Sequence, residues 1–259
     1  MSLDVQNLTI SLSSGEKMTD GISFSIGKGE MLSIVGSSGA GKTTICRAVM
    51  GLLETNYITK GMIEYGSKNL LTLPKEQLQK IYGREVCYIP QNPMTAFNPS
   101  VRIGKQLEKT YIRHNDVGSR TEIFALTEPV LRRLGIEDTK RIWKSYPFAL
   151  SGGMLQRVMI AAALMNGPHL LIADEVTTAI DACNRMGLMK ELNKLCDEGM
   201  SVLFVTHDLF SAANSSKILI MNHGKAVESG KTQEVMENPK EDYTKYLLEA
   251  CRLKRRKAT

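Results

Sequence analysis

Residues 36–43 have the spacing of a loop that binds phosphate groups. They read Gly-Ser-Ser-Gly-Ala-Gly-Lys-Thr and satisfy the pattern G-x-x-x-x-G-K-[ST]. Glycines let consecutive backbone N–H groups turn toward one anion, and a following helix adds the partial positive charge of its N-terminus. In such a loop Lys42 reaches the outer phosphates of a nucleotide such as ATP, and the Thr43 hydroxyl can bind Mg²⁺. The predicted nucleotide contacts are Gly36, Ser37, Ser38, Gly39, Ala40, Gly41, Lys42, Thr43 and Thr44.

Two adjacent carboxylates follow an apolar run later in the chain. Residues 170–173 are continuously apolar, as expected of a buried strand, and lead into Asp174 and Glu175. Ligand sites of open parallel sheets lie at the carboxyl ends of the strands. Asp174 is therefore predicted to orient Mg²⁺, and Glu175 to position and polarise the water that attacks the γ-phosphate. Without the phosphate loop, two solvated acids at a strand end would be the simpler interpretation.

A histidine follows another predicted strand. The apolar run 202–205 leads into Thr206, His207 and Asp208, so His207 is expected at the same edge of the sheet. This position favours a phosphate contact, although a single histidine at a strand end is more often incidental.

The elements that must position these residues follow from the apolar patterning. Alternating apolar and polar residues at 3–12 and 21–26 predict two antiparallel strands. Helical spacing over 42–53 and helical texture over 103–150 predict a helix after the phosphate loop and a helical insertion. Short continuous apolar runs, typical of strands in a parallel sheet, occupy 31–35, 86–89, 170–173, 202–205 and 218–221.

The end of the chain adds a short strand at 225–229 and two helices within 232–251, interrupted near Pro239. The predicted fold is thus an α/β P-loop NTPase. It combines a mainly parallel core sheet, an N-terminal antiparallel β subdomain and a helical insertion.

Composition excludes several classes of protein. With 259 residues, 42% hydrophobic and 23% charged, the chain lies near the globular average, which excludes a disordered or collagen-like protein. No apolar run approaches the ~18 residues of a membrane-spanning helix, and residues 1–4 do not begin a secretory signal, so a cytosolic location is expected. The net charge of +6 is densest at 252–257. That tail is either a solvated fringe or a contact for nucleic acid or anionic lipid.

Residues 150–157 read Leu-Ser-Gly-Gly-Met-Leu-Gln-Arg and resemble the signature motif of ABC-transporter ATPases. Ser151 can cap a helix running from about Gly153 to Met165, and Gly152 and Gly153 let its N-terminal amides approach an anion. In the ABC family this helix end faces the ATP of the other subunit. The resemblance therefore implies that two ATPase subunits close head to tail over two nucleotides, with Ser151, Gly152 and Gly153 as further nucleotide contacts.

The order of the motifs along the chain is also similar to that of the ABC family. Gln91 resembles the Q-loop residue that touches Mg²⁺ and links the site to the membrane subunits. Asp181 resembles the D-loop aspartate that crosses the dimer interface, and His207 resembles the switch histidine that contacts the γ-phosphate. The resemblance implies a single ABC ATPase domain over 1–259. Its core and β subdomain occupy about 1–95 and 165–259, and the helical subdomain, which carries the signature, occupies about 96–164.

Residues 89–99, 155–161 and 243–248 resemble the peptide and nickel importer subfamily. The resemblance implies an ATP-binding and ATP-hydrolysing subunit that couples Mg-ATP hydrolysis to uptake of peptides, nickel or metal-chelate solutes. The implied partners are a second ABC ATPase subunit, usually a different chain, two transmembrane permeases and an extracellular solute-binding protein. The implied location is the cytoplasmic face of the cell membrane, as a peripheral subunit, and nucleic acid is not expected as a partner.

Two alternatives remain open. A soluble ABC ATPase acting on nucleic acid or ribosomes is motivated by the basic tail and the missing membrane span. A structural partner with poor hydrolysis is motivated by two departures from the family pattern. Leu12 stands where many members have an aromatic residue that stacks on adenine, and Val176 stands where proline usually follows the glutamate.

Overall fold

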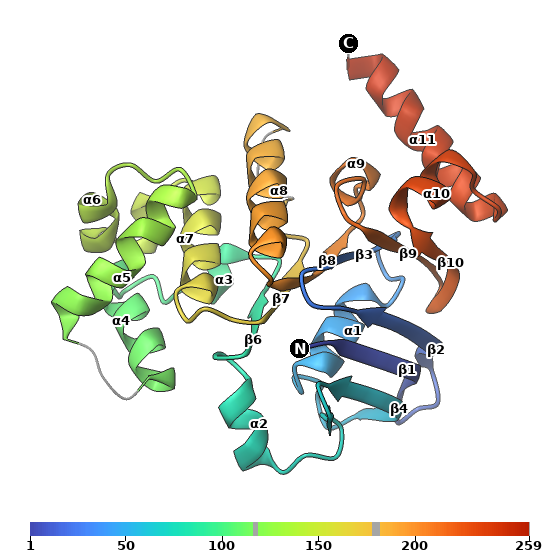
Figure 1. Cartoon of the computed structure of the whole chain (residues 1–259), viewed down its shortest axis with the longest axis horizontal. Coiled ribbons are helices and arrows are strands. Elements are labelled where there is room, and N and C mark those ends of the chain that lie inside the picture. The colour runs from blue at the N-terminus through green and yellow to red at the C-terminus, as the bar shows by residue number, and fades with distance from the viewer. Residues whose placement is uncertain (116–118, 178–181, 259) are drawn as a thin grey trace.

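The central β-sheet forms the middle of the computed structural model, which describes residues 1–115, 119–177 and 182–258 (Figure 1). Within the described ranges the strand order is β10 (Lys225–Lys231), β9 (Lys217–Asn222), β3 (Met31–Gly36), β8 (Ser201–Thr206), β7 (Leu170–Asp174) and β6 (Val86–Ile89). Neighbouring strands from β9 to β6 pair in parallel, and β10 pairs antiparallel to β9. Every residue of β3, β7 and β8 is buried, which confirms the strands predicted from continuous apolar runs.

A second, antiparallel sheet contains the N-terminus. The expected pairing of its first two strands is confirmed, with Leu3 opposite Ile26. The apolar patterning does not predict β4, which pairs with the other edge of β1. None of the first six residues of β4 is buried, so an apolar face is missing from that stretch of the sequence. The spatial order of the sheet is β2 (Lys17–Ile26), β1 (Leu3–Leu12), β4 (Tyr57–Tyr65) and β5 (Lys68–Asn69).

Helix α1 (Lys42–Val49) begins directly after the phosphate loop. One apolar cluster joins this helix to both sheets and includes Ile45 of α1, Ile10 of β1 and Ile34 of β3. The helix is shorter than the predicted 42–53, because Gly51 takes a left-handed φ of 61°. A left-handed glycine just past the last turn is a common way for a helix to end.

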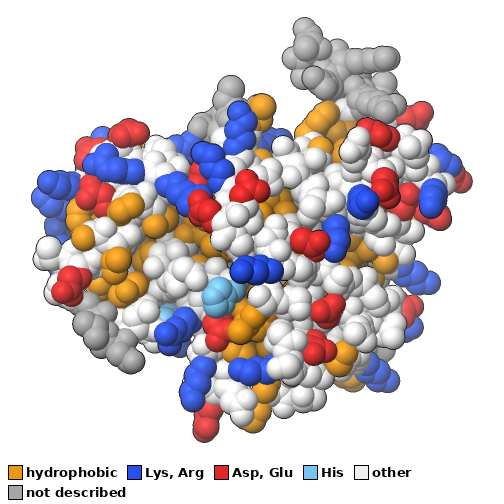
Figure 2. Space-filling view, viewed as in Figure 1, with side chains coloured by type: hydrophobic (Ala, Val, Ile, Leu, Met, Phe, Trp, Pro, Cys, Tyr) orange, Lys and Arg blue, Asp and Glu red, His pale blue; other side chains and the backbone are white. Residues whose placement is uncertain are grey.

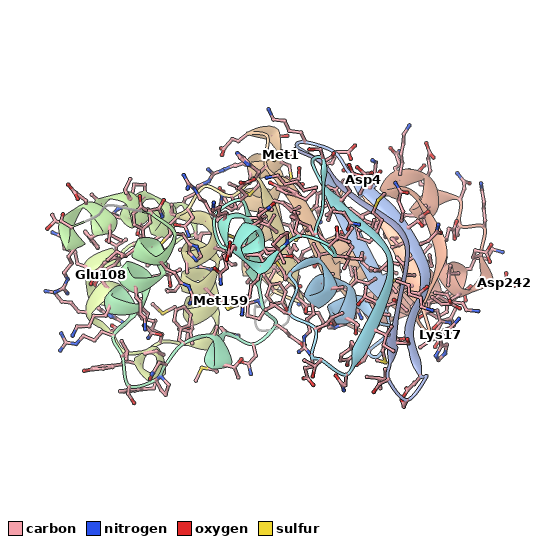
Figure 3. The ribbon with its side chains drawn as sticks, turned by 90° about the horizontal axis from the view of Figure 1, so that it is seen from below. Met1, Asp4, Lys17, Glu108, Met159 and Asp242 are labelled. Carbon is pink, nitrogen blue, oxygen red and sulfur yellow. The ribbon has the colours of Figure 1, made fainter. Side chains whose placement is uncertain are left out.

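The helices between β6 and β7 lie to one side of the central sheet, which confirms the predicted helical insertion. Figure 3 shows Glu108 and Met159 on this side, far from Lys17 of the antiparallel sheet. An apolar cluster joins these helices to each other and to α8 (Ala182–Asp197) and includes Leu107, Leu131 and Leu155. The insertion contains α3 (Pro93–Ala96), α4 (Ile103–His114), α5 (Arg120–Arg133), α6 (Thr139–Lys144), the 3₁₀ turn Pro147–Ala149 and α7 (Gly152–Leu164), and α2 (Lys75–Ile81) precedes β6.

The last part of the chain packs beside the central sheet. Helix α9 (Leu209–Ala212) follows β8, and α10 (Thr232–Glu237) and α11 (Asp242–Ala258) follow β10, so the two predicted C-terminal helices are confirmed. Leu209 and Leu247 belong to one apolar cluster, which holds α11 against α9. Among the helices of the described ranges, none is both long and apolar enough to cross a lipid bilayer.

Candidate functional site

The phosphate loop connects the central strand β3 to α1. Gly41 has a left-handed φ of 90°, and a Cβ at this position would lie 2.6 Å from the carbonyl oxygen of Met18. Both features require glycine, because other residues avoid this conformation and a side chain would clash with backbone. Glycine at position 41 therefore lets the loop pass close to the backbone of β2 without a clash.

The ammonium group of Lys42 lies inside this loop. It donates hydrogen bonds to the carbonyl oxygens of Gly36 at 2.9 Å and Ser37 at 2.8 Å, and the residue is 4% exposed. Burial lowers the pKa of Lys42, while the nearby carboxylates of Glu175 and Asp174 oppose that shift. The arrangement places a buried positive charge where the outer phosphates of a nucleotide would bind.

Asp174 ends β7 and receives a hydrogen bond on each carboxylate oxygen. The Thr43 hydroxyl donates to Oδ1 at 3.1 Å, and the Tyr88 hydroxyl donates to Oδ2 at 3.0 Å. Burial raises the pKa of Asp174, and these two hydrogen bonds act in the opposite direction. Tyr88 is a site residue that the sequence analysis missed, and its only signal there is a hydroxyl within an otherwise apolar strand.

The residues around Asp174 fit a magnesium ion. Mg²⁺ prefers oxygen ligands and is usually held by one or two protein groups together with phosphates. Thr43 and Asp174 supply a hydroxyl and a carboxylate side by side. A magnesium ion held in this way does not need three or more ligands from the protein. Among the described residues, no group of three or more His, Cys, Asp or Glu side chains is arranged to hold a metal ion.

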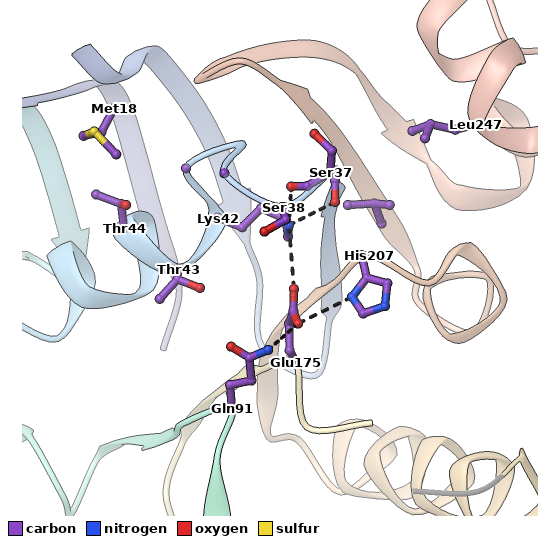
Figure 4. A pocket seen from close by; sticks show the side chains of 14 residues that line it. Met18, Ser37, Ser38, Lys42, Thr43, Thr44, Gln91, Glu175, His207 and Leu247 are labelled. Carbon is purple, nitrogen blue, oxygen red and sulfur yellow. Dashed lines mark hydrogen bonds and ion pairs between the residues drawn. The ribbon is translucent and has the colours of Figure 1, made fainter. Parts of the chain in front are cut away.

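Glu175 is the point where distant parts of the chain meet (Figure 4). Its carboxylate accepts a hydrogen bond from Gln91 Nε2 at 2.8 Å and lies 3.4 Å from His207 Nδ1 and 3.8 Å from Lys42 Nζ. Its backbone has a φ of 49°, and its amide donates to the Val205 carbonyl oxygen at 2.8 Å. A left-handed conformation is uncommon for a residue other than glycine and concentrates at functional sites.

The loop after His207 is anchored by Asp208. This carboxylate caps α9 by accepting hydrogen bonds from the Phe210 and Ser211 amides, and it also binds the Ser211 hydroxyl. Arg185 of α8 reaches it with Nη1 at 2.9 Å. Burial alone would raise the pKa of Asp208, but these hydrogen bonds outweigh it and hold the pKa below its usual value.

These groups surround a cavity of about 590 Å³, a volume typical of small-molecule sites. It is open to solvent. Figure 4 shows the side chains that line it beside the phosphate loop. Ala40 and Asp174 are buried and do not line it. The lining residues are Met18, Val35, Gly36, Ser37, Ser38, Gly39, Gly41, Lys42, Thr43, Thr44, Gln91, Glu175, His207 and Leu247.

The family model described as ABC transporter matches residues 19–178. The chain belongs to the ABC transporter family. It is 37% identical over 254 residues to the dipeptide transport ATP-binding protein DppD of Lactococcus lactis subsp. cremoris, covering 96% of this chain and 73% of that relative. It is 36% identical over 251 residues to the metal-staphylopine import system ATP-binding protein CntD of Staphylococcus aureus, covering 95% and 92%. The expected resemblance to peptide and metal importer ATPases is thereby confirmed.

Solved structures agree with this membership. The dimeric bacterial ABC transporter cassette MJ0796 superposes with a TM-score of 0.80 at 28% identity, covering 89% of this chain and 98% of that chain. Its post-hydrolysis state, bound to ADP and Pi, superposes with a TM-score of 0.80 at 27% identity. The predicted fold class is confirmed, and the chain is an ATPase of the ABC family.

In this ABC ATPase the signature motif lies apart from the cavity. Ser151 caps α7 by accepting a hydrogen bond from the Met154 amide at 3.3 Å, as the sequence predicts. Gly152 and Gly153 are in the first turn, and a Cβ on either would meet nothing within 4 Å. None of the three residues lines the cavity. Asp181, the other residue expected to act across a dimer, lies outside the described residues.

Three lining residues of the ABC ATPase were not predicted. Val35 of β3 directly precedes the phosphate loop, and Met18 of β2 and Leu247 of α11 also reach the cavity. Leu12, the residue at the position of the missing aromatic, is not among its described lining residues. Met18 and Leu247 belong to no motif, so spacing gives no signal for them. Val176, the other departure from the family pattern, is 1% exposed and belongs to the apolar cluster of the helical insertion.

Proposed function

We propose that this ABC ATPase is the ATP-binding and ATP-hydrolysing subunit of an importer for peptides or metal-chelate solutes. The observation that carries the proposal is the convergence of Lys42, Gln91 and His207 on Glu175 beside the phosphate loop. The solute class rests on the similar relatives, whose names refer to dipeptide, oligopeptide and metal-staphylopine transport.

The reaction in this proposal is phosphoryl transfer from ATP to water. Lys42 and the amides of residues 36–44 bind the phosphates and offset their charge. The Glu175 carboxylate accepts a hydrogen bond from the attacking water, while Gln91 and His207 hold that carboxylate in place. His207 also stabilises charge on the γ-phosphate. Mg²⁺, held by Thr43, Asp174 and Gln91, would neutralise charge on the phosphate oxygens.

A second ATPase subunit supplies what the cavity lacks. Ser151, Gly152 and Gly153 of the partner would place the N-terminus of their helix against the γ-phosphate, and Asp181 would act across the same interface. Three features support this arrangement. Ser151 and Gly152 are exposed, a Cβ on Gly152 or Gly153 would meet nothing within 4 Å, and none of the three residues lines the cavity of its own chain. The partner is expected to be a different ABC chain.

Two permeases would dock on the helical side of the subunit. A mainly apolar groove of about 360 Å³ runs between the end of α1 and the helical insertion, and its lining includes Leu52, Pro90 and Phe97. Pro90 precedes Gln91, so a segment bound there would lie next to the residue that contacts Glu175. The proposal therefore places the subunit at the cytoplasmic face of the membrane and treats 96–164 as the helical subdomain.

A role on nucleic acid or ribosomes is the competing function. Proteins of that kind usually carry a basic stripe on one face. On the face shown in Figure 2, Lys and Arg side chains are interspersed with Asp and Glu side chains. That face therefore carries no continuous basic stripe of the kind that the competing function uses.

The test measures Mg-ATP hydrolysis by the chain alone and after co-expression with the ATPase and permeases encoded by adjacent genes. A binding protein loaded with solute is added to the complex. We expect one class of loaded solute to stimulate hydrolysis, and the same complex carrying Glu175→Gln to show no stimulation. A flat response to peptides and metal chelates, together with binding to RNA or DNA that weakens steeply with salt, would contradict the proposal.

A further inference from the structure

Tyr88 makes a contact with the metal-site carboxylate that no motif describes. It lies on β6, next to β7, where Tyr88 is opposite Ile172 in the parallel register. Its hydroxyl extends to the end of β7 and donates a hydrogen bond of 3.0 Å to Asp174 Oδ2. The other oxygen, Oδ1, accepts from the Thr43 hydroxyl at 3.1 Å. Each oxygen of the Asp174 carboxylate thus accepts one hydrogen bond, and the two bonds together fix the orientation of the carboxylate.

The surroundings of Tyr88 keep its hydroxyl in the role of donor. Its ring packs against the apolar cluster around α1. A phenol carries its proton at neutral pH and can donate it in a hydrogen bond. A carboxylate accepts hydrogen bonds only, so the direction of the bond is settled by the chemistry of the two groups.

We propose that Tyr88 is a positioning residue of the metal site, whose hydroxyl holds the Asp174 carboxylate in the orientation that binds the metal ion. The inference rests on the proposed role of Asp174 as a Mg²⁺ ligand. Partners that orient a ligating group commonly change metal affinity by about 10- to 100-fold when they are removed. Tyr88 acts through Asp174, and no direct contact with nucleotide or metal is part of the proposal.

A purely structural role makes a different prediction. The Tyr88 ring also lines the apolar groove beside Pro90 and Phe97, so the residue could simply form part of the groove wall. Tyr88→Phe separates the two roles, because it keeps the ring and removes only the hydroxyl. Tyr82 offers a matched control. Its hydroxyl also donates one partly buried hydrogen bond, at 2.8 Å, but to the Val49 carbonyl oxygen instead of Asp174.

The experiment measures binding of the fluorescent analogue mant-ATP to the purified chain, first in EDTA and then during titration with Mg²⁺. For Tyr88→Phe we expect the half-saturating Mg²⁺ concentration to rise about tenfold. Binding in EDTA is expected to stay unchanged, and Tyr82→Phe is expected to match the wild type in both conditions. Asp174→Asn serves as the reference for a lost metal ligand. Thermal unfolding of Tyr88→Phe, measured beside that of Tyr82→Phe and the wild type, checks that the variant is folded.

Three results would overturn the proposal, and they separate it from the proposed function. Unchanged Mg²⁺ dependence in Tyr88→Phe, with a shift in Asp174→Asn, removes the role of the hydroxyl and leaves the metal site intact. Equal losses in EDTA and in Mg²⁺ mean that Tyr88 is structural. No shift in Asp174→Asn means that Asp174 is not the metal ligand, so the proposed site and the role of Tyr88 fall together.

Discussion

The chain presents two helix N-termini suited to anions, and they differ in how complete they are. At α1, Gly41 lies against the backbone of Met18, and the Lys42 ammonium group donates hydrogen bonds to two carbonyl oxygens of the loop. At α7 the first turn carries Gly152 and Gly153 with open space around them and a single side-chain cap. The first is a binding site within one chain. The second has the features of a surface that becomes a site only when another molecule covers it.

The largest effect is expected in the cavity beside the phosphate loop. Glu175→Gln keeps the size of the side chain but removes the charge that we propose orients and activates water. We expect hydrolysis by the assembled complex to fall about a thousandfold, within the range of general-base catalysis. ATP binding should persist, because Lys42 and the loop are untouched. Steady-state hydrolysis and equilibrium binding of ATP measure the two effects, and equal losses in both would contradict the assigned role.

The second largest effect is expected at the N-terminus of α7, in the signature motif. Gly153→Asp adds a negative charge near the N-terminus of α7, where a carboxylate stabilises the helix itself. The same charge would repel the γ-phosphate of a nucleotide bound by the partner, so hydrolysis by the complex is expected to fall roughly a hundredfold.

Gly153→Ala controls for the added bulk in that experiment, since a Cβ at Gly153 meets nothing within 4 Å. It should fold normally and lose much less activity than Gly153→Asp. ATP binding by the isolated subunit should be normal in both variants. Weaker binding by isolated Gly153→Asp would show that the signature acts within its own chain, and would remove the distinction between the two helix ends.

A smaller effect is expected where α8 meets the loop of His207. Arg185→Gln removes the charged hydrogen bond of 2.9 Å to Asp208, which caps α9 immediately after His207. A charge-assisted bond of this kind contributes about 1.5–3 kcal/mol to stability. We expect its loss to displace the loop of His207 and to lower kcat roughly tenfold, which corresponds to about 1.4 kcal/mol of activation free energy. The KM for ATP should change little, because Arg185 does not line the cavity. Arg185→Lys should restore part of kcat, and a change confined to KM would contradict the argument.

Local spacing explains why much of the site could be predicted from the sequence. The phosphate loop and the Ser151 cap are each set by residues that lie close together in the sequence, so their patterns identify them. Parallel topology then brings Glu175 and His207 to one edge of the sheet. Tyr88 and Met18 depend instead on strand register and side-chain reach, and β4 lacks a buried face over its first half. Such features leave no periodic signal.

The smallest effect is expected at Met18, in the cavity beside the phosphate loop. Met18 lines the cavity beside the phosphate loop, so its flexible thioether can bury one face of a nucleotide base in place of an aromatic ring (Figure 4). Met18→Ala should weaken ATP binding by about threefold, as expected for the loss of one apolar contact worth about 0.7 kcal/mol. Leu12→Ala is the control, because Leu12 is not among the described lining residues. A larger loss in Leu12→Ala than in Met18→Ala, measured by equilibrium binding, would return the base contact to the position predicted by the sequence pattern.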